Sequence, residues 1–399
     1  MTRSAGWLIG AGFAFVPLFP AFITLTGVSA PGVSLLSRPA AWSLFGLSAL
    51  LDALLLWAVL QPPRRAAPTL VPLLCWLLAA VLSAAMGFAP LAGLVFLAIY
   101  AMSVVWHVGV LRYAGEPAAA AVIFWCLAFS AAAASTTAIV MEALRSPADL
   151  YAVGHGRAIG TFVLPGELAG YLIVVLPLMF ALSREGASRA LRWAAGGALT
   201  AGLAAFVLTF SRTGWIGLAA AGACYAVWSG AVRRRYAPLI VAGAVLAVLA
   251  LFNVHHNPAE NYTRLSIWQA ALEMIRRFPL TGVGPFDFAR VYPMVRVPGG
   301  DAQAFHAHNV VLTIFAETGI AGVSAMVWVW WRFAVLLRER LAHAAPANAA
   351  LALAIAAGLA GTWVQGLIDT VSVVIFGLWL PVMALALAVA GSGQTKEQK

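Results

Sequence analysis

The sequence predicts an all-α polytopic membrane protein with about twelve transmembrane helices and one long loop outside the bilayer. Three observations lead to this fold class. The 399 residues are 63% hydrophobic and only 10% charged, whereas soluble domains carry about 25% charged residues. Apolar runs of about 20 residues, long enough to cross ~30 Å of hydrocarbon as helix, recur along the chain. The alternating apolar segments that indicate a transmembrane barrel do not occur.

Each predicted span is one apolar run of helical length. The spans cover residues 5–26, 41–60, 67–86, 88–111, 117–141, 162–182, 193–210, 213–231, 237–254, 309–335, 347–368 and 371–390. Residues 1–399 are therefore expected to form a single integral membrane domain that contains the long loop at 255–308. Cys75, Cys126 and Cys224 all fall inside spans, so no disulfide framework is expected.

The basic residues give the expected orientation. The net charge is +10, and 15 of the 24 lysines and arginines fall on one side of the predicted topology. These are Arg3, Arg64, Arg65, Arg112, Arg184, Arg189, Arg192, Arg233, Arg234, Arg235, Arg332, Arg338, Arg340, Lys396 and Lys399. The positive-inside rule makes this side cytoplasmic and places both termini there. Membrane topology explains most of the basic excess, so no nucleic-acid partner is expected.

Three segments on the opposite, outer face are more than plain connectors: residues 142–161, the tight turn at 211–213 and the long loop. They carry Arg157, Arg212 and Arg264, respectively. Short outer loops disfavour arginine, so Arg157 and Arg212 call for a reason, whereas long loops translocate largely regardless of charge. For each arginine alone, the alternative is an anchor at the membrane interface.

The long loop contains a predicted helix. The stretch TRLSIWQAALEMIRRFP is amphipathic and is expected to lie on or near the membrane surface, with Thr263 as N-cap and Pro279 as stop. Its apolar stripe consists of Leu265, Trp268, Leu272 and Ile275. The glycines of the following TGVGPFDF suit a turn where the backbone approaches a ligand or another segment. This Gly-x-Gly follows no strand, so it is no dinucleotide-binding signature.

The three arginines and the histidines His306 and His308 form a candidate anion site on the outer face. Guanidinium groups bind phosphate through a planar, permanently charged fork, which suits a diphosphate. An anion embedded in the membrane and handled from outside indicates a lipid-linked diphosphate. Histidine adds a group that takes up a proton near neutral pH. A metal site is the rival interpretation of His-x-His, but on a helix the two rings would point to different faces.

One acid completes the set of candidates. Asp369 lies near the outer end of the eleventh span, where it could hold a histidine tautomer or pair with an arginine, and Glu142 and Glu167 are weaker candidates. A transporter or flippase for an anionic lipid could use the same arginines, with Asp369 and a histidine as proton relay. Transporter sites usually lie near the bilayer midplane at the interface of repeated halves, whereas the ionisable residues here cluster at the outer face.

Four segments resemble those of bacterial O-antigen ligases, in the same order, between about residues 155 and 325. His308-Asn309, followed after nine residues by GIAGV, resembles the family's His-Asn…Gly-x-x-Gly signature. GRAIGTFVLPGELAGYL resembles its Arg-x-x-Gly-Thr-Phe-x-x-Pro-Asn stretch, and FSRTGWIGL and RLSIWQAALEMIRRFPLTGVGPFDF resemble two further segments. In one departure, Gly166 follows the proline where the family often has asparagine. This puts a side-chain role there in doubt, though not at Arg157 or Thr161.

The resemblance implies a glycosyltransferase with a multi-span fold of the C type (GT-C). Such enzymes move glycan from undecaprenyl diphosphate to an acceptor on the periplasmic face of the bacterial inner membrane. For a ligase, the acceptor is a sugar hydroxyl of lipid A–core. His308 is then the expected base, Arg157, Arg212, Arg264 and His306 are expected to bind the diphosphate, and Thr161, Asn309 and Asp369 to support them. Neither metal nor cofactor is expected. Related members polymerise O-antigen repeats or glycosylate proteins.

Overall fold

The computed structural model describes residues 2–17, 38–61, 67–146, 156–162, 164–236, 258–369 and 379–390, together with the single positions 148, 154, 239 and 243. The described residues form helices and connecting segments, with no strand among them. Of the predicted spans, 237–254 falls outside this part of the chain except for two positions. Residues 18–26 of span 5–26, most of residues 147–155 in the outer connector 142–161, and residues 371–378 of the last span are also outside it.

The described helices follow the predicted spans closely. The first five are α1 (Thr2–Phe15), α3 (Arg38–Leu60), α4 (Leu70–Met86), α5 (Pro90–Tyr113) and α6 (Pro117–Leu144). They are followed by α8 (Pro165–Glu185), α9 (Arg189–Leu208), α10 (Arg212–Trp228) and a 3₁₀ turn, η2 (Arg234–Tyr236). The last five are α12 (Pro258–Arg277), α13 (Phe288–Val295), α14 (Val310–His343), α15 (Pro346–Gly366) and α17 (Trp379–Val389).

Local sequence explains where these helices begin. Proline is the first residue of α5, α6, α8 and α15, where its missing N–H costs nothing and its fixed φ suits the first turn. Ser188 and Ser211 cap α9 and α10, because their hydroxyls accept hydrogen bonds from Leu191 N and Gly214 N at 3.1 Å each. The tight turn predicted before Arg212 is therefore confirmed as a capped helix start.

Five of the described helices are long and apolar enough to cross a membrane: α6, α8, α9, α14 and α15. Two shorter apolar helices are the segment Ala49–Leu60 of α3 and the whole of α4. The helical membrane protein predicted from composition is confirmed, while the number of twelve crossings stays a prediction. α8 lies at the centre of the bundle, and 83% of an apolar stretch of 18 residues within it is buried. It packs against α9, α10 and α15, which explains why it is apolar on every side.

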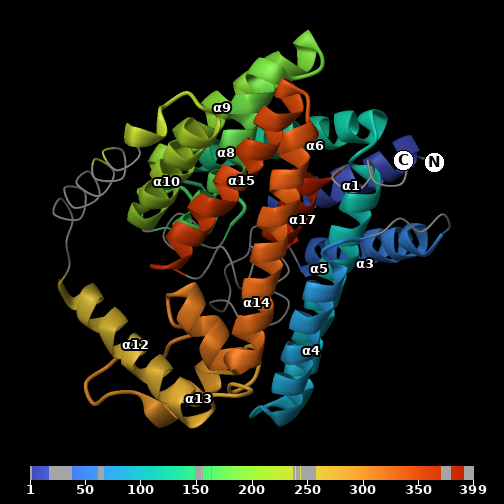
Figure 1. The fold of residues 1–399 in the computed structure, drawn as a ribbon. Helices are drawn as coiled ribbons and strands as arrows, with labels where there is room; N and C mark the ends of the chain where they lie inside the picture. Colours follow the sequence, from blue (N-terminus) through green and yellow to red (C-terminus); the bar gives the residue numbers. More distant parts are fainter. Residues whose placement is uncertain are drawn as a thin grey trace.

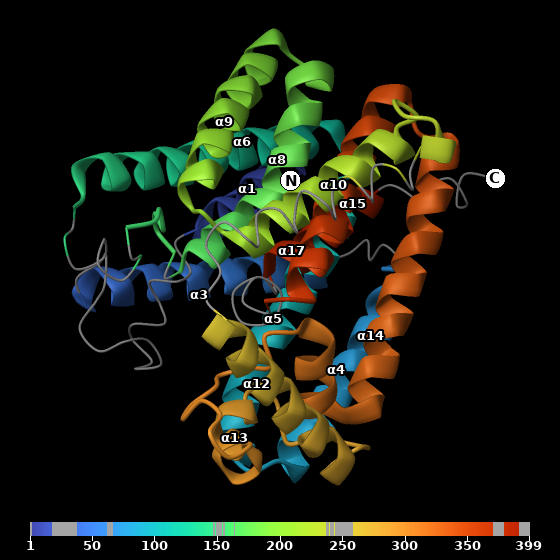
Figure 2. The same cartoon turned by 90° about the vertical axis from the view of Figure 1, so that its left-hand side faces the viewer.

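Connectors that were predicted to share a side of the membrane lie together. On the side predicted to be inner, Arg112 Nη1 donates to Val59 O at 2.6 Å, and Arg340 Nη1 donates to Leu387 O at 2.8 Å. On the other side, Phe88 N donates to Val283 O at 3.2 Å. Figures 1 and 2 agree with this division: α12 and α13 gather at one end of the molecule, and the turn between α8 and α9 lies at the other.

The long loop is a small folded unit with two helices, not one. Ile267, Ala270 and Met274 of α12 pack with Phe288 and Tyr292 of α13 in a core of their own. The predicted amphipathic helix exists, but it begins at Pro258, so the N-cap expected at Thr263 is wrong. Of the predicted stripe, Ile275 packs against this core, whereas the two leucines are open, as a face directed at a membrane surface would be. Leu265 and Leu272 are 55% and 54% exposed, whereas Ile267 is 2% exposed.

α14 has a sharp kink at Gly319, where φ is 63° and ψ is −166°. The kink interrupts the helical ladder, and the segment 279–284 replaces the lost bonds. Val283 N donates to Ala316 O at 2.8 Å, and Ile320 N donates to Pro279 O at 2.9 Å. A Cβ on Gly282 would lie 2.3 Å from the carbonyl carbon of Glu317. The predicted close approach of TGVGPFDF to another segment is thus confirmed.

Candidate functional site

Three side chains from distant parts of the chain meet at the start of α14. The Nδ1 of His308 lies 3.4 Å from Oδ1 of Asp369. The rings of His306 and His308 pack edge to face with centroids 4.3 Å apart. The two histidines precede α14, so the helical geometry that would direct their rings to different faces does not apply to them. His308 is the more open of the two, with its side chain 34% exposed, whereas His306 is 6% exposed.

Asn309 joins the two segments that carry this cluster. Its Oδ1 caps α14 by accepting a hydrogen bond from Leu312 N at 3.0 Å. Its Nδ2 donates to Leu367 O at 2.9 Å, just before Asp369. One amide side chain therefore fixes both the start of the helix that follows His308 and the connector that holds Asp369. This supports the expected supporting role of Asn309 with a defined geometry.

His306 acts on the backbone of His308. Its Nδ1 accepts a hydrogen bond from His308 N at 3.1 Å, so the neutral ring carries its proton on Nε2. Burial, and then the neighbouring His308, lower the pKa of His306 to about 3, against an opposing effect of Asp369. His308 itself has a positive φ of 48°, a conformation that is uncommon outside glycine and that this hydrogen bond helps to hold.

Asp369 is seated against the first turn of α8. A Cβ on Gly166 would lie 3.3 Å from its Oδ2, and Gln365 Nε2 donates to Gly166 O at 3.1 Å. Burial alone would raise the pKa of Asp369, but the contact with His308 and the charges of His308, His306 and Arg264 lower it below its usual value. The acid is therefore ionised, and it favours the His308 tautomer with hydrogen on Nδ1 and Nε2 free to accept a proton.

The cluster also meets the geometric requirement for a metal site. One ligand atom each from His306, His308 and Asp369 lies within 4.8 Å of the others. The third residue of this set, Asp369, is distant from the histidines in the sequence. The contacts of these atoms favour proton transfer over metal binding. His306 Nδ1 accepts a hydrogen bond from a backbone N–H, and His308 Nδ1 faces the carboxylate of Asp369. The proton-transfer chemistry of a His–Asp pair fits this arrangement without further rearrangement.

The three predicted arginines lie on different elements. Arg264, on α12, acts electrostatically on Asp369. Arg212 is the first residue of α10. The connector of Arg157 is bonded to the end of α9, because Ala158 N donates to Leu208 O at 2.9 Å. Within the described residues, neither Arg212 nor Arg264 has an ion pair with a carboxylate. Two half-buried guanidinium groups thus keep their charge available for an anion.

Three other predicted residues have simpler surroundings. The Thr161 Oγ1 is buried and has no hydrogen-bond partner among the described residues. Glu167 is buried, and its Oε2 accepts from Leu164 N at 3.4 Å at the start of α8, which is a helix-capping role. Glu142 lies in the last turn of α6. Neither glutamate belongs to the cluster of His306, His308 and Asp369.

Two acids missed in the sequence hold the framework of the site. Glu317 is 4% exposed beside the kink of α14, and backbone N–H groups of Phe286 and Phe288 bind its carboxylate. Asp287 is equally buried, and its Oδ2 accepts from Ala89 N at 2.8 Å. Both stand inside segments that resembled the family. A carboxyl group within an apolar run is costly to bury. The position of Glu317 inside such a run was therefore the sequence signal that could have identified it.

Residues 197–327 match the family model described as O-antigen ligase. This match confirms the resemblance for the three sequence segments that it contains, while the segment at 156–172 lies outside it. It includes Arg212, Arg264, His306, His308 and Asn309, whereas Arg157, Thr161 and Asp369 lie outside it. A comparison with curated proteins finds no match.

Proposed function

We propose that this membrane protein of the O-antigen ligase family transfers O-antigen glycan from undecaprenyl diphosphate to a sugar hydroxyl of lipid A–core. The observation that carries the proposal is the pairing of His308 Nδ1 with Asp369 Oδ1 at 3.4 Å. It leaves a half-exposed imidazole with a free Nε2 at the predicted outer face. The family match supports the coarser assignment, a membrane glycosyltransferase with lipid-linked substrates.

In the proposed reaction, His308 is the general base. The proton of the acceptor hydroxyl passes to His308 Nε2 while the hydroxyl oxygen forms a bond to the anomeric carbon of the donor glycan. The bond between that carbon and the diphosphate oxygen breaks, and its electron pair stays on the diphosphate. A single displacement of this kind inverts the anomeric centre. Asp369 holds the imidazole tautomer and stabilises the imidazolium that forms.

The departing diphosphate is a polyanion, and we assign its binding to Arg157, Arg212 and Arg264. Preorganised guanidinium groups stabilise charge as it develops in the transition state. A buried, neutral His306 offers no positive charge. We therefore assign His306 to positioning His308 through the bond from His308 N. We retain Thr161 as a supporting residue, because its buried hydroxyl has no hydrogen-bond partner among the described residues and can donate to a bound group.

We further propose twelve crossings, a GT-C arrangement and a bacterial inner-membrane location with both termini in the cytoplasm. Contacts between connectors on the same predicted side support this topology. With the cluster outside, the donor headgroup meets His308 in the periplasm.

The direct test incubates purified protein with undecaprenyl-diphosphate-linked glycan and one acceptor at a time, without nucleotide sugar or added metal. We expect glycan to appear on lipid A–core. Transfer to the growing glycan or to a protein instead would identify a polymerase or a protein glycosyltransferase of the same superfamily. Movement of intact donor across vesicle membranes without any transfer would identify a flippase and reject the proposal.

Transfer is expected to survive EDTA and to fall about 10-fold or more in Arg212→Lys. The substitution keeps the charge but removes the planar fork that binds a diphosphate at two points. The measurement is the initial transfer rate across donor concentrations. Arg296→Lys, at an exposed residue of the long loop, is the matched control and should behave as wild type. A strict divalent-ion requirement, restored by re-addition after EDTA, would contradict the assignment of charge stabilisation to arginine.

The topology predicts that Arg157, Arg212 and His308 share the periplasmic side and that Arg233–Arg235 lie opposite. In a background without Cys75, Cys126 and Cys224, a cysteine at position 308 should react with an impermeant thiol reagent added outside the cell. A cysteine at position 234 should react only after the membrane is opened. The reverse pattern would place the histidines in the cytoplasm and remove the site from its substrate.

A further inference from the structure

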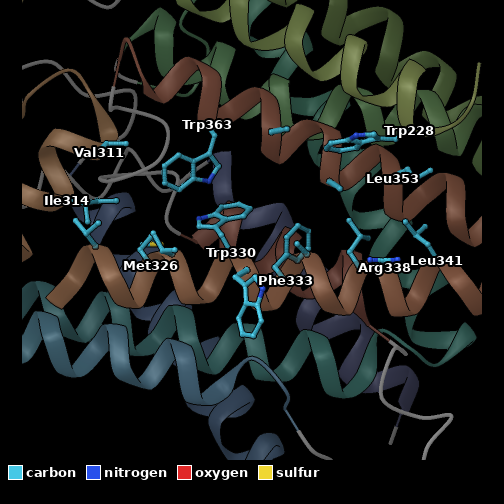
Figure 3. A pocket seen from close by; sticks show the side chains of 17 residues that line it. Trp228, Val311, Ile314, Met326, Trp330, Phe333, Arg338, Leu341, Leu353 and Trp363 are labelled. Carbon is cyan, nitrogen blue, oxygen red and sulfur yellow. The ribbon is translucent and has the colours of Figure 1, made fainter. Parts of the chain in front are cut away.

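An apolar groove of about 910 Å³ runs along α14 and is walled by α15, with Trp228 of α10 at one end. Its lining is apolar and aromatic except for Arg338. Figure 3 shows Val311 and Ile314 at one end, Trp228, Arg338 and Leu341 at the other, and the rings of Trp330 and Trp363 between them. The proposed chemistry at His308 makes no use of this groove.

The groove begins where the candidate site ends. Val311 lies in the first turn of α14, directly after His308 and Asn309. On the opposite wall, Trp363 lies in the last turn of α15, shortly before Asp369. The same two chain segments therefore form the His308–Asp369 pair and the outer end of the groove. A lipid with its headgroup at the pair would have its chain directed into this space.

The length of the groove selects among lipids. From Val323 to Leu341 alone, α14 rises roughly 27 Å at 1.5 Å per residue, and the segment before the kink adds to this. The groove therefore extends across nearly all of the ~30 Å of hydrocarbon. An acyl chain occupies about half of that thickness. A chain that follows the groove from end to end must be much longer, as a polyprenyl chain is.

The middle of the groove is a fixed aromatic wall. The Trp330 ring lies edge to face against Trp363, with centroids 5.2 Å apart at 85°, and against Phe333, with centroids 5.7 Å apart at 90°. These contacts hold the three rings in place. Methyl branches and double bonds make an isoprenoid stiffer than an acyl chain, so it loses less conformational freedom when it is held against a rigid surface.

We infer that this groove binds the isoprenoid chain of the lipid diphosphate donor along its full length. The inference rests on the proposed function. The diphosphate lies at the His308–Asp369 end, and the chain passes Trp330 and Trp363 to end near Trp228 and Leu341. The groove thus recognises donor chain length, separately from the glycan and the diphosphate.

The test crosses a groove-filling variant with donors of two chain lengths. Ala334 lines the groove beyond Trp330. Ala334→Trp should lower transfer from a subsaturating undecaprenyl donor about tenfold, equivalent to about 1.4 kcal/mol. Transfer from a geranyl donor with the same diphosphate and glycan should stay within about twofold, because its two isoprene units do not reach this depth. Ala204→Trp, on an exposed face of α9 outside the groove, should leave both rates unchanged.

Ala334→Leu should show the same selectivity to a smaller extent. An equal effect of Ala334→Trp on both donors, or no effect on the undecaprenyl donor, would overturn the inference. Wild-type protein gives an independent readout: a diazirine at the far end of the polyprenyl chain should label peptides containing Trp228 or Leu341. Labelling confined to other helices would also overturn it. If the wild-type protein transferred glycan from neither donor, the proposed function would be rejected. The labelling result would still show whether the polyprenyl chain binds in the groove.

Discussion

His308→Ala is expected to lower the initial rate of glycan transfer by about 10²–10⁴-fold, the usual contribution of a general base. The substitution removes the one imidazole of the cluster that combines partial exposure with a carboxylate on its Nδ1. Donor binding should be largely retained, because the arginines to which we assign diphosphate binding are unchanged. Transfer rate, donor affinity and thermal stability are measured on the same preparation.

The matched control is His343→Ala. His343 is an exposed histidine at the opposite end of α14, where its Nδ1 lies 3.0 Å from Glu339 O. This variant should transfer glycan at the wild-type rate. Near wild-type transfer by His308→Ala would remove the proposed base. Loss of donor binding with little change in the rate at saturation would move His308 from the proton-transfer step to the anion site.

Asp369→Asn is expected to lower the rate by about 10²-fold or more, although the change preserves size and packing. An amide can donate to His308 Nδ1, which favours the tautomer with hydrogen on Nε2 and leaves no base for the acceptor. It also removes the negative charge that would stabilise the imidazolium. Asp301→Asn, at an exposed acid of the long loop, is the control and should have no effect.

The double variant His308→Ala/Asp369→Asn separates a functional pair from two independent sites. If Asp369 acts through His308, its substitution should cost little once the imidazole is gone, so the two effects should be far from additive. Full additivity would show that Asp369 serves another purpose, such as packing against α8. A lowered melting temperature in Asp369→Asn alone would point the same way.

The helices could be predicted from the sequence, because hydrocarbon length and apolar runs leave few alternatives. α8, α14 and α15 lie where continuous apolar stretches required them. Helix starts were harder to predict. Thr263 satisfied a capping preference, yet α12 begins at Pro258, since proline is equally suited to the first turn and its neighbours continue the helix. The stripe of Leu265 and Leu272 was a real periodicity, but α12 carries a second apolar face, and that face packs on α13.

The candidate site could be predicted residue by residue but not as a geometry. His308 and Asp369 were identified by type and by the predicted side of the membrane. Their contact depends on how α8, α14 and α15 pack, and no spacing in the chain encodes that packing. The enclosure of His306 could not be predicted. Its place in the loop beside His308 suggested a residue that helps to bind the diphosphate, whereas the fold of the long loop and the start of α14 enclose it to 6% exposure.

The His308–Asp369 pair is divided between two stretches of the chain, and only the histidine lies inside the matched segment 197–327. A protein could match that segment in full and carry an apolar residue at the position of Asp369. It would match the same family model while lacking the acid that we propose orients the base. A transfer activity should therefore be inferred from a genome sequence only where the counterparts of both His308 and Asp369 are present. Chains that carry only the histidine are candidates for inactive or repurposed proteins.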